Sequence, residues 1–425
     1  MLSTLRNAWK VPELRKKILW TVFLVAIFRL GAHIVVPGVD TDFLSEISSS
    51  SGLLGFYDLL SGGAFSSFSI MALGVMPYIN ASIIMQLLTI AIPPLEQIQK
   101  EGLEGRKKIQ NATRYVSIVL AIILAIGVLF TISNQGALSN LSKFDYVVVI
   151  FSLVVGSTFC IWLGDEITEK GLGNGTSILI FVNIISRVPT AIASLSKLYE
   201  METVTIVEIV LLIVGLIILL ALAIFFSLAE RRIPVQYAGK ASGTKVSKAQ
   251  STYIPLSIIS AAVIAIIFAM SVMGFPQAIA SFFPNASWAT WITTSEYSIF
   301  NESTWMYPVI YALLTVFFTW FYNEVTLKPD EMAENLKKSS GVILGVRPGE
   351  DTERYISRIL ARVSFIGGIF AAFLAVLPTI IEKHTSFGSL SLGATSILIV
   401  IGVALDSSRQ LQSQMVMRHY EGFLK

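Results

Sequence analysis

Ten apolar runs separated by shorter polar stretches dominate the chain. Several are near or below the roughly 20 residues that a helix needs to cross a bilayer. This pattern predicts an all-α polytopic membrane protein with ten transmembrane helices. The fifth and tenth runs begin with Gly173-Asn174-Gly175 and Gly393-Ala394-Thr395, which we expect to start helices inside the protein body. The runs cover roughly residues 18–36, 70–92, 113–133, 145–163, 174–195, 205–228, 254–273, 305–325, 361–380 and 390–405.

Composition supports this class. The 425 residues are 54% hydrophobic and 14% charged, with a mean hydropathy of +0.71, which excludes a soluble domain of this size. The first run is long enough to span and no small-residue cleavage site ends it, so we expect a membrane helix rather than a cleaved signal peptide. Cys160 is the single cysteine; it can form no internal disulfide, and we expect it to pack inside a span.

Charge predicts the orientation of the spans. If the N-terminus is cytoplasmic, most of the 31 Lys and Arg residues fall on the cytoplasmic side, and only Lys143, Arg187, Lys197 and Lys383 fall in the outside loops. Positive residues concentrate in the cytoplasmic loops of membrane proteins. The sequence therefore predicts that both termini face the cytoplasm.

The stretch from Leu54 to Thr89 departs from an ordinary span. Its first part is short and rich in Gly and Ser, and from Phe65 onward it is apolar and predicts a helix interrupted by Gly74 and Pro77. Breaks in a membrane helix are tolerated only against protein or a water-filled cavity. We interpret this stretch as a movable half-helix in front of a pore-lining helix. The alternative is a loop followed by a span with a proline kink.

Two long loops, 229–252 and 323–358, are predicted to lie in the cytoplasm. Both are basic, carry Pro and Gly at turn positions with apolar residues between them, and are expected to form projecting hairpins. The paired Arg231-Arg232 near Tyr237 favours a docking surface for a cytosolic protein or RNA. The alternative is a solvated loop whose Lys and Arg only set the orientation.

Motifs for catalysis or ion coupling are missing from the sequence. It contains no phosphate-binding loop, no zinc-ligand spacing among its three histidines and no nucleophile elbow. Ionisable residues such as Arg29, Asp165 and Glu208 form no cluster at the middle of the spans, where a coupled transporter usually keeps them. A conduit or a scaffold that is not an enzyme, without a cofactor or metal, is the remaining interpretation.

Several long strings resemble the SecY family, which includes Sec61-alpha and provides the central channel subunit of protein translocases. They include PELRKKIL from Pro12, RLGAHIVVPGVD from Arg29 and LSGGAFSSFSIMALGVMPYINASIIMQLLT from Leu60. WLGDEITEKGLGNGTSILIF from Trp162 and AENLKKSSGVILGVRPG from Ala333 follow in the family's order. The resemblance covers nearly the whole chain.

The resemblance implies two pseudo-symmetric halves around a central pore, at residues 18–195 and 205–405. A cytoplasmic segment, 1–17, would precede them, and a cytoplasmic tail, 406–425, would follow. A ring of apolar side chains would narrow the pore, a plug at about 55–63 would close it, and a lateral gate would open toward lipid. The implied ring is Val75, Ile79, Thr176, Ile180, Ile267 and Ile399, with Thr176 replacing the usual aliphatic residue. The implied plug is Gly55, Phe56, Tyr57, Leu59, Leu60, Ser61, Gly62 and Gly63, and the implied gate residues are Gln86, Thr89, Ser257 and Ile259.

The same resemblance implies the partners. A motor ATPase, SecA, or the ribosome would dock on the cytoplasmic loops at Arg231, Arg232, Tyr237, Lys240 and Arg347. SecE and SecG would be companion subunits, and the cargo would be an unfolded preprotein with a signal sequence, or a helix released into membrane lipid. The expected location is the bacterial plasma membrane.

The seventh run departs from the family's usual pattern. Ser257 and Ile259 replace a usual Lys and Asn, and Ala262 and Ala265 replace a usual Gly and Pro. An apolar gate seam buries no amide, so we expect a gate that stays closed more firmly and requires more hydrophobic signals. Unchanged export of weak signal sequences after Ile259→Asn would contradict this expectation. A secondary transporter, a membrane enzyme of lipid-linked substrates and a specialised accessory translocon paralogue are the alternatives to the channel.

Overall fold

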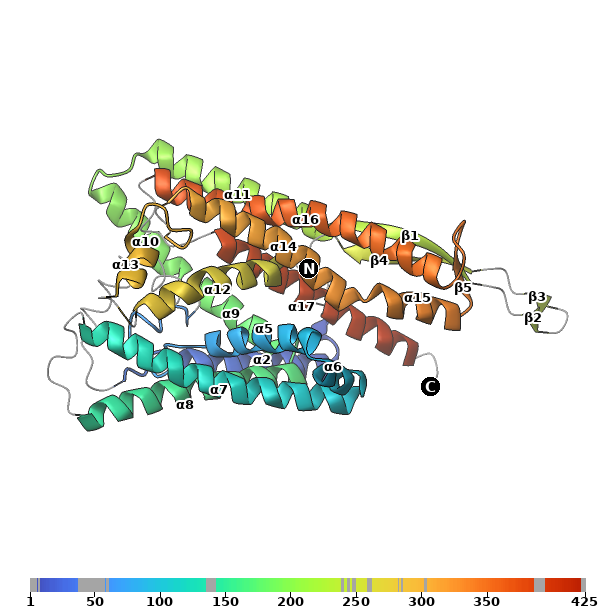
Figure 1. The fold of residues 1–425 in the computed structure, drawn as a ribbon, viewed down its shortest axis with the longest axis horizontal. Coiled ribbons are helices and arrows are strands. Elements are labelled where there is room, and N and C mark those ends of the chain that lie inside the picture. Colours follow the sequence, from blue (N-terminus) through green and yellow to red (C-terminus); the bar gives the residue numbers. More distant parts are fainter. Residues whose placement is uncertain are drawn as a thin grey trace.

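The computed structural model describes residues 6, 8–36, 58, 61–134, 143–237, 241–242, 245–246, 250–257, 262–281, 283, 286–301, 304–385 and 394–421. Within these residues the fold is a bundle of long helices with a small sheet at one end (Figure 1). The short helices α10 and α13 lie at the opposite end of the bundle.

The first part of the chain forms seven helices within the described residues. Asn174 caps α9 by accepting a hydrogen bond from the Ser177 backbone N–H at 3.2 Å, which confirms the predicted helix start after Gly173. The turn between α5 and α6 bends the chain by 101°. The helices are α2 (Pro12–Gly31), α5 (Met76–Ala91), α6 (Pro93–Lys100), α7 (Leu103–Asn134), α8 (Lys143–Lys170), α9 (Gly175–Ser186) and α10 (Val188–Glu200).

The second part forms seven further helices within the described residues. Helix α11 begins with a capping box, in which Thr205 and Glu208 satisfy each other's backbone N–H groups. Helix α17 begins at Ala394, as the sequence predicts. The helices are α11 (Ile206–Leu228), α12 (Ala262–Ser281), α13 (Ser287–Thr294), α14 (Met306–Leu327), α15 (Pro329–Lys338), α16 (Glu350–His384) and α17 (Ala394–Glu421).

Six of the described helical segments are long and apolar enough to cross a membrane, and the bent pair α5–α6 makes a seventh. One of the six joins α9 and α10 into a single span. These segments confirm an all-α polytopic membrane protein. The expected number of ten spans stays a prediction.

Apolar packing connects the two parts of the chain. In one cluster Ile83 of α5 packs with Phe268 and Met273 of α12 and with Tyr311 of α14. Cys160 of α8 is buried in a second cluster, as expected. The bundle is therefore held across its middle by side chains from both halves of the sequence.

The two long loops that the sequence places in the cytoplasm fold together into one platform. Strands β1 (Glu230–Tyr237) and β4 (Gln250–Ser257) form the hairpin that the sequence predicts, and β2 (Ala241–Ser242) pairs with β3 (Lys245–Val246). The second loop forms no hairpin of its own, which corrects the prediction. It forms α15 and then β5 (Gly341–Ile343), which pairs antiparallel with β1. The reason is apolar burial: Ile233, Val235, Leu256, Leu336, Ile343 and Ile356 form one core shared by both loops.

Two predicted helix starts are wrong. The seventh run was expected to be helical from residue 254, but β4 extends to Ser257 and α12 begins at Ala262. Pairing with β1 accounts for the strand, because Leu256 is buried in the platform core. The second run was expected to be helical from Phe65, but α5 begins at Met76. Pro77 lies in the first turn of α5, so it starts the helix rather than kinking it.

Candidate functional site

Residues 61–75, which precede α5, follow a series of turns packed into the bundle. Gly62, Gly63 and Gly74 have positive φ angles of 68°, 86° and 51°, which glycine adopts without the steric cost that other residues meet. Phe68, with a φ angle of 42°, turns the segment back on itself. The Ile70 backbone N–H then donates a hydrogen bond to the Ile34 carbonyl. The segment therefore crosses the interior as a compact loop rather than as a helix.

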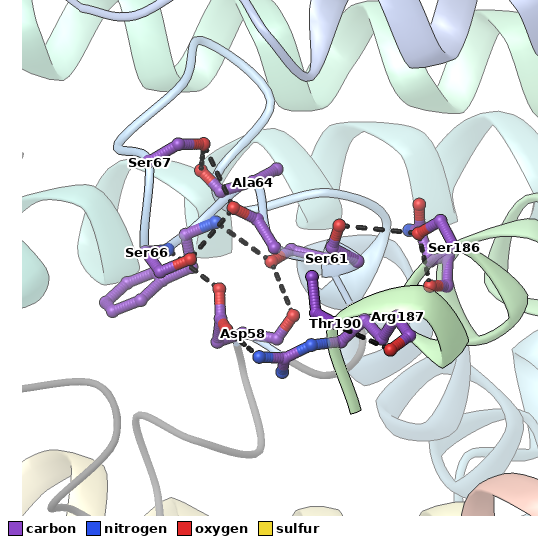
Figure 2. Close-up of polar contacts among 12 residues, drawn as sticks. Asp58, Ser61, Ala64, Ser66, Ser67, Ser186, Arg187 and Thr190 are labelled. Carbon is purple, nitrogen blue, oxygen red and sulfur yellow. Dashed lines mark hydrogen bonds and ion pairs between the residues drawn. The ribbon is translucent and has the colours of Figure 1, made fainter. Parts of the chain in front are cut away.

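Asp58 organises the first turn of this loop, as Figure 2 shows. Its Oδ1 accepts a hydrogen bond from the Ser66 backbone N–H at 2.7 Å. Its backbone carbonyl accepts from the Ser61 hydroxyl and from the Gly63 N–H, at 3.1 and 3.0 Å. The Ser61 hydroxyl oxygen in turn accepts from the Phe65 N–H. These bonds join Asp58 and residues 61–66 into one hydrogen-bonded turn.

A buried ion pair joins this turn to the junction of α9 and α10. Asp58 Oδ2 lies 2.7 Å from Nη2 of Arg187, and the Asp58 side chain is only 2% exposed. Arg187 is both the C-cap residue of α9 and the N-cap residue of α10. A carboxylate buried this deeply requires a partner of opposite charge. The contact therefore fixes the loop to the α9–α10 junction.

A second cation approaches the same turn from α2. Arg29 Nη1 lies 3.4 Å from the Gly62 carbonyl and 3.3 Å from Asn183 Oδ1. The Ser186 hydroxyl also reaches the Gly62 carbonyl, at 3.4 Å. A Cβ at Gly62 would lie 2.8 Å from Asn183 Cα and 2.9 Å from Arg29 Nη1. Only glycine leaves room for this approach.

Five of the six predicted ring residues come together next to this loop. Val75, Ile180 and Ile399 are buried in one apolar cluster, and Ile79 and Ile267 pack against it. They come from the residue before α5, from α5 itself and from α9, α12 and α17. Thr176, one turn before Ile180 on α9, is half-buried and packs beside Gly164 of α8.

The predicted plug lies only partly within the described residues. Ser61, Gly62 and Gly63 form the turn held by Asp58, and Asp58 and Ser61 have helical backbone. Gly55, Phe56, Tyr57, Leu59 and Leu60 lie outside the described residues.

The predicted gate residues that the structure describes lie on two different elements, α5 and β4. Gln86 is exposed on α5, and Thr89 is buried with its hydroxyl donating to the Met85 carbonyl at 2.6 Å. Ser257 was assigned to a gate helix, but it ends strand β4 opposite Glu230. Ile259 lies outside the described residues.

The predicted docking residues lie on the platform where they are described. Arg231 and Arg347 are exposed, and Tyr237 is half-buried against the platform core. Arg232 donates to the Glu230 carboxylate at 2.6 Å and its guanidinium lies 4.7 Å from the centre of the Tyr253 ring. The bond to Glu230 raises the pKa of Arg232, so this side chain stays charged. Lys240 lies outside the described residues.

The sequence alone did not identify Asp58, Asn183 or Ser186. It showed Arg29 only as an ionisable residue outside any cluster, and Arg187 only as a residue of an outside loop. A lone carboxylate in a Gly/Ser-rich stretch and a lone arginine at the end of a span were the available signals. Neither identifies its partner, because the two residues meet only in the folded chain.

Comparisons with known proteins agree with this architecture. The sequence profile of the SecY family matches residues 69–408. The protein translocase subunit SecY of Streptomyces coelicolor is 39% identical to this chain, with 100% of both chains covered. The subunit of the same name from Thermotoga maritima is 40% identical, with 100% of this chain and 98% of the relative covered.

Solved structures share the fold. The structure of a protein-conducting channel matches with a TM-score of 0.69 at 18% identity, over 96% of each chain. A SecY structure in which the plug domain stabilises the closed state matches with a TM-score of 0.67, and Sec61 of the canine ribosome–channel complex from the endoplasmic reticulum matches with 0.66. Each of these two is 18% identical over 96% of both chains.

Proposed function

The chain belongs to the SecY family of protein translocase subunits, and on that premise we propose that it forms the channel through which unfolded proteins cross a membrane. It is a multi-pass membrane protein, and its family is one of channels rather than enzymes. One observation carries the proposal. Apolar side chains contributed by α5, α9, α12 and α17 converge beside a loop that polar contacts hold in place.

The converging residues are the proposed constriction. Val75, Ile79, Ile180, Ile267 and Ile399 offer no hydrogen bond to water or ions, so the ring closes to small solutes by dewetting. Aliphatic side chains also deform around a passing chain without selecting its sequence. Thr176, which packs beside Gly164 of α8, would be a polar neighbour of the ring.

The loop that begins at Asp58 is the proposed plug, and the seam between α5–α7 and α12–α14 is the proposed lateral gate. Ile83 packs across this seam against α12 and α14, and α12 also lies against α7. An apolar seam can part toward lipid and exchange its contacts for those of a signal sequence. Two halves, 18–195 and 205–405, would move apart during opening.

The platform is the proposed docking site for the partner that supplies energy. Arg231, Arg232 and Arg347 place positive charge on its surface. Either a SecA-type motor or the ribosome would bind there, with SecE and SecG as companion subunits. The proposed location is the bacterial plasma membrane with both termini in the cytoplasm.

A crosslinking experiment tests the channel function. Ile79→Cys is placed at the ring of a Cys160→Ala protein, and a stalled secretory chain carries one cysteine of its own. We expect a disulfide to Ile79→Cys only when the motor and ATP are present. Phe151→Cys, on an exposed face of α8, is the matched control and is expected to remain free. Equal crosslinking at both positions, or none at the ring while the chain is being exported, would contradict the proposal.

A further inference from the structure

Two arginines from two different elements hold one turn of the plug. Arg187 comes from the α9–α10 junction and Arg29 from the last turn of α2. Both reach residues 58–62, where Arg187 contacts a carboxylate and Arg29 contacts a carbonyl. The turn therefore closes against two elements that lie far apart in the sequence.

The contacts of Asp58 divide into two classes. Ser66, Ser61 and Gly63 bond to Asp58 within the turn, so these bonds can move with it. The pair with Arg187 joins the turn to another element and must break if the turn leaves. Breaking it separates a carboxylate that is 2% exposed from a guanidinium that is 21% exposed. Charges buried to this degree are strongly destabilised when they lose their partner.

Arg187 does not use all of its guanidinium N–H groups in the contact with Asp58, which favours a contact that can break. Nη1 of Arg187 is buried without a hydrogen-bond partner among the described residues. A bidentate pair would hold the carboxylate with both arms of the guanidinium. Here one arm holds it, so the pair fixes the position of the turn while remaining weaker than the best geometry allows.

Resting on the channel function proposed above, we propose that Asp58, Arg187 and Arg29 are the positioning residues of a latch that keeps the plug closed. The ion pair supplies the part of the latch that joins two opposite charges, and Arg29, which also contacts Asn183, adds a hydrogen bond from a cation to the neutral carbonyl of Gly62. A translocating chain opens the channel by displacing the turn as a unit, because the bonds that join Asp58 to Ser61, Gly63 and Ser66 remain satisfied during the movement.

Ion leak through the resting channel measures the latch. Asp58→Asn keeps the shape of the side chain and removes its charge, so we expect the leak of reconstituted proteoliposomes to rise at least tenfold. Arg187→Gln removes the charge from the other side and gives the same expectation, which covers the case in which one variant fails to assemble. Arg187→Lys keeps the charge and is expected to leak far less than Arg187→Gln.

A charge swap separates a latch from a purely structural contact. The double variant Asp58→Arg with Arg187→Asp restores an ion pair and is expected to leak less than either single charge reversal. Asp165→Asn is the control, because it breaks a different ion pair, Arg114–Asp165 at 2.8 Å between α7 and α8. It is expected to leave the leak unchanged.

Two outcomes would overturn the latch. In one, Asp58→Asn and Arg187→Gln assemble, export proteins and leak no more than the unmodified channel. In the other, the charge swap leaks as much as the single reversals. Export by the unmodified channel is measured in the same vesicles. If the unmodified channel exports no protein, the proposed channel function is overturned. If the variants export normally and leak no more than the unmodified channel, only the latch is overturned.

Discussion

At the scale of single residues, Gly62 carries the tightest constraint on the proposed plug. Its φ angle of 68° and its approach to Asn183 and Arg29 both exclude a side chain. Gly62→Ala is therefore expected to lower the free energy of unfolding and to raise the resting ion leak, because the turn must withdraw from α9. The left-handed backbone alone costs about 1–2 kcal/mol. Thermal unfolding in detergent and leak in proteoliposomes measure the two effects.

Gly63 provides a matched control for Gly62. Its φ angle of 86° is equally unfavourable for alanine, but a Cβ there meets no atom within 4 Å. Gly63→Ala is expected to show only the backbone cost and little leak. Equal leak from the two alanine variants would mean that backbone strain, rather than the close approach to α9, explains the effect.

A long matching string allows the sequence to predict which side chains lie close together, while the role of these side chains in a pore stays a prediction. Five ring residues named from the sequence do meet in one apolar cluster. The polar contacts of the plug could not be predicted in this way. Asp58 and Arg187 belong to separate stretches, and their pairing depends on how α9 packs against the turn.

At the scale of elements, the positions of most helices could be predicted and the starts of two could not. An apolar run indicates only that its residues are buried away from water. Buried turns and buried strands can be as apolar as buried helices, so the run alone does not identify the type of element. Residues 61–75 form turns because four positive φ angles interrupt them. Residues 250–257 form a strand because β1 offers a partner. The sequence of an apolar run does not show which other segment the run will pack against in the folded chain.

The platform is an element-scale unit whose stability can be tested at β5. Ile343 is 2% exposed and belongs to the core shared by the two loops, whereas its neighbour Val342 points outward and is 41% exposed. Ile343→Ala is expected to destabilise the platform by about 2–5 kcal/mol and to speed amide hydrogen exchange throughout β1.

Val342→Ala is the control for this change, because it shortens a side chain on the opposite face of the same strand. We expect it to change the stability by no more than about 0.5 kcal/mol. Binding of the motor or ribosome should fall with Ile343→Ala and not with Val342→Ala. Rapid exchange of β1 in both variants would show that β5 does not depend on the shared core.

At the scale of the whole molecule, the two ends of the bundle differ in chemistry. The platform end carries Arg231, Arg232 and Arg347, and the C-terminal helix ends on the same side (Figure 1). The opposite end carries α10 and α13, and exposed aromatic residues occur within α13 and in the sequence on either side of it. They are Phe283, Trp288, Trp291, Tyr297 and Trp305. Tryptophan and tyrosine are enriched at the membrane surface, and basic loops face the cytoplasm.

This difference predicts the orientation of the protein in its membrane. Tyr297→Cys, at a site 79% exposed beside α13, is expected to react with a membrane-impermeant maleimide in right-side-out vesicles. Leu344→Cys, at a site 61% exposed on the platform, is expected to react only in inverted vesicles. Cys160 is buried and gives no background. The reverse labelling pattern would place the platform outside the cell. Neither a motor driven by cytosolic ATP nor a ribosome could reach it there. That result would refute both the proposed orientation and the proposed docking role.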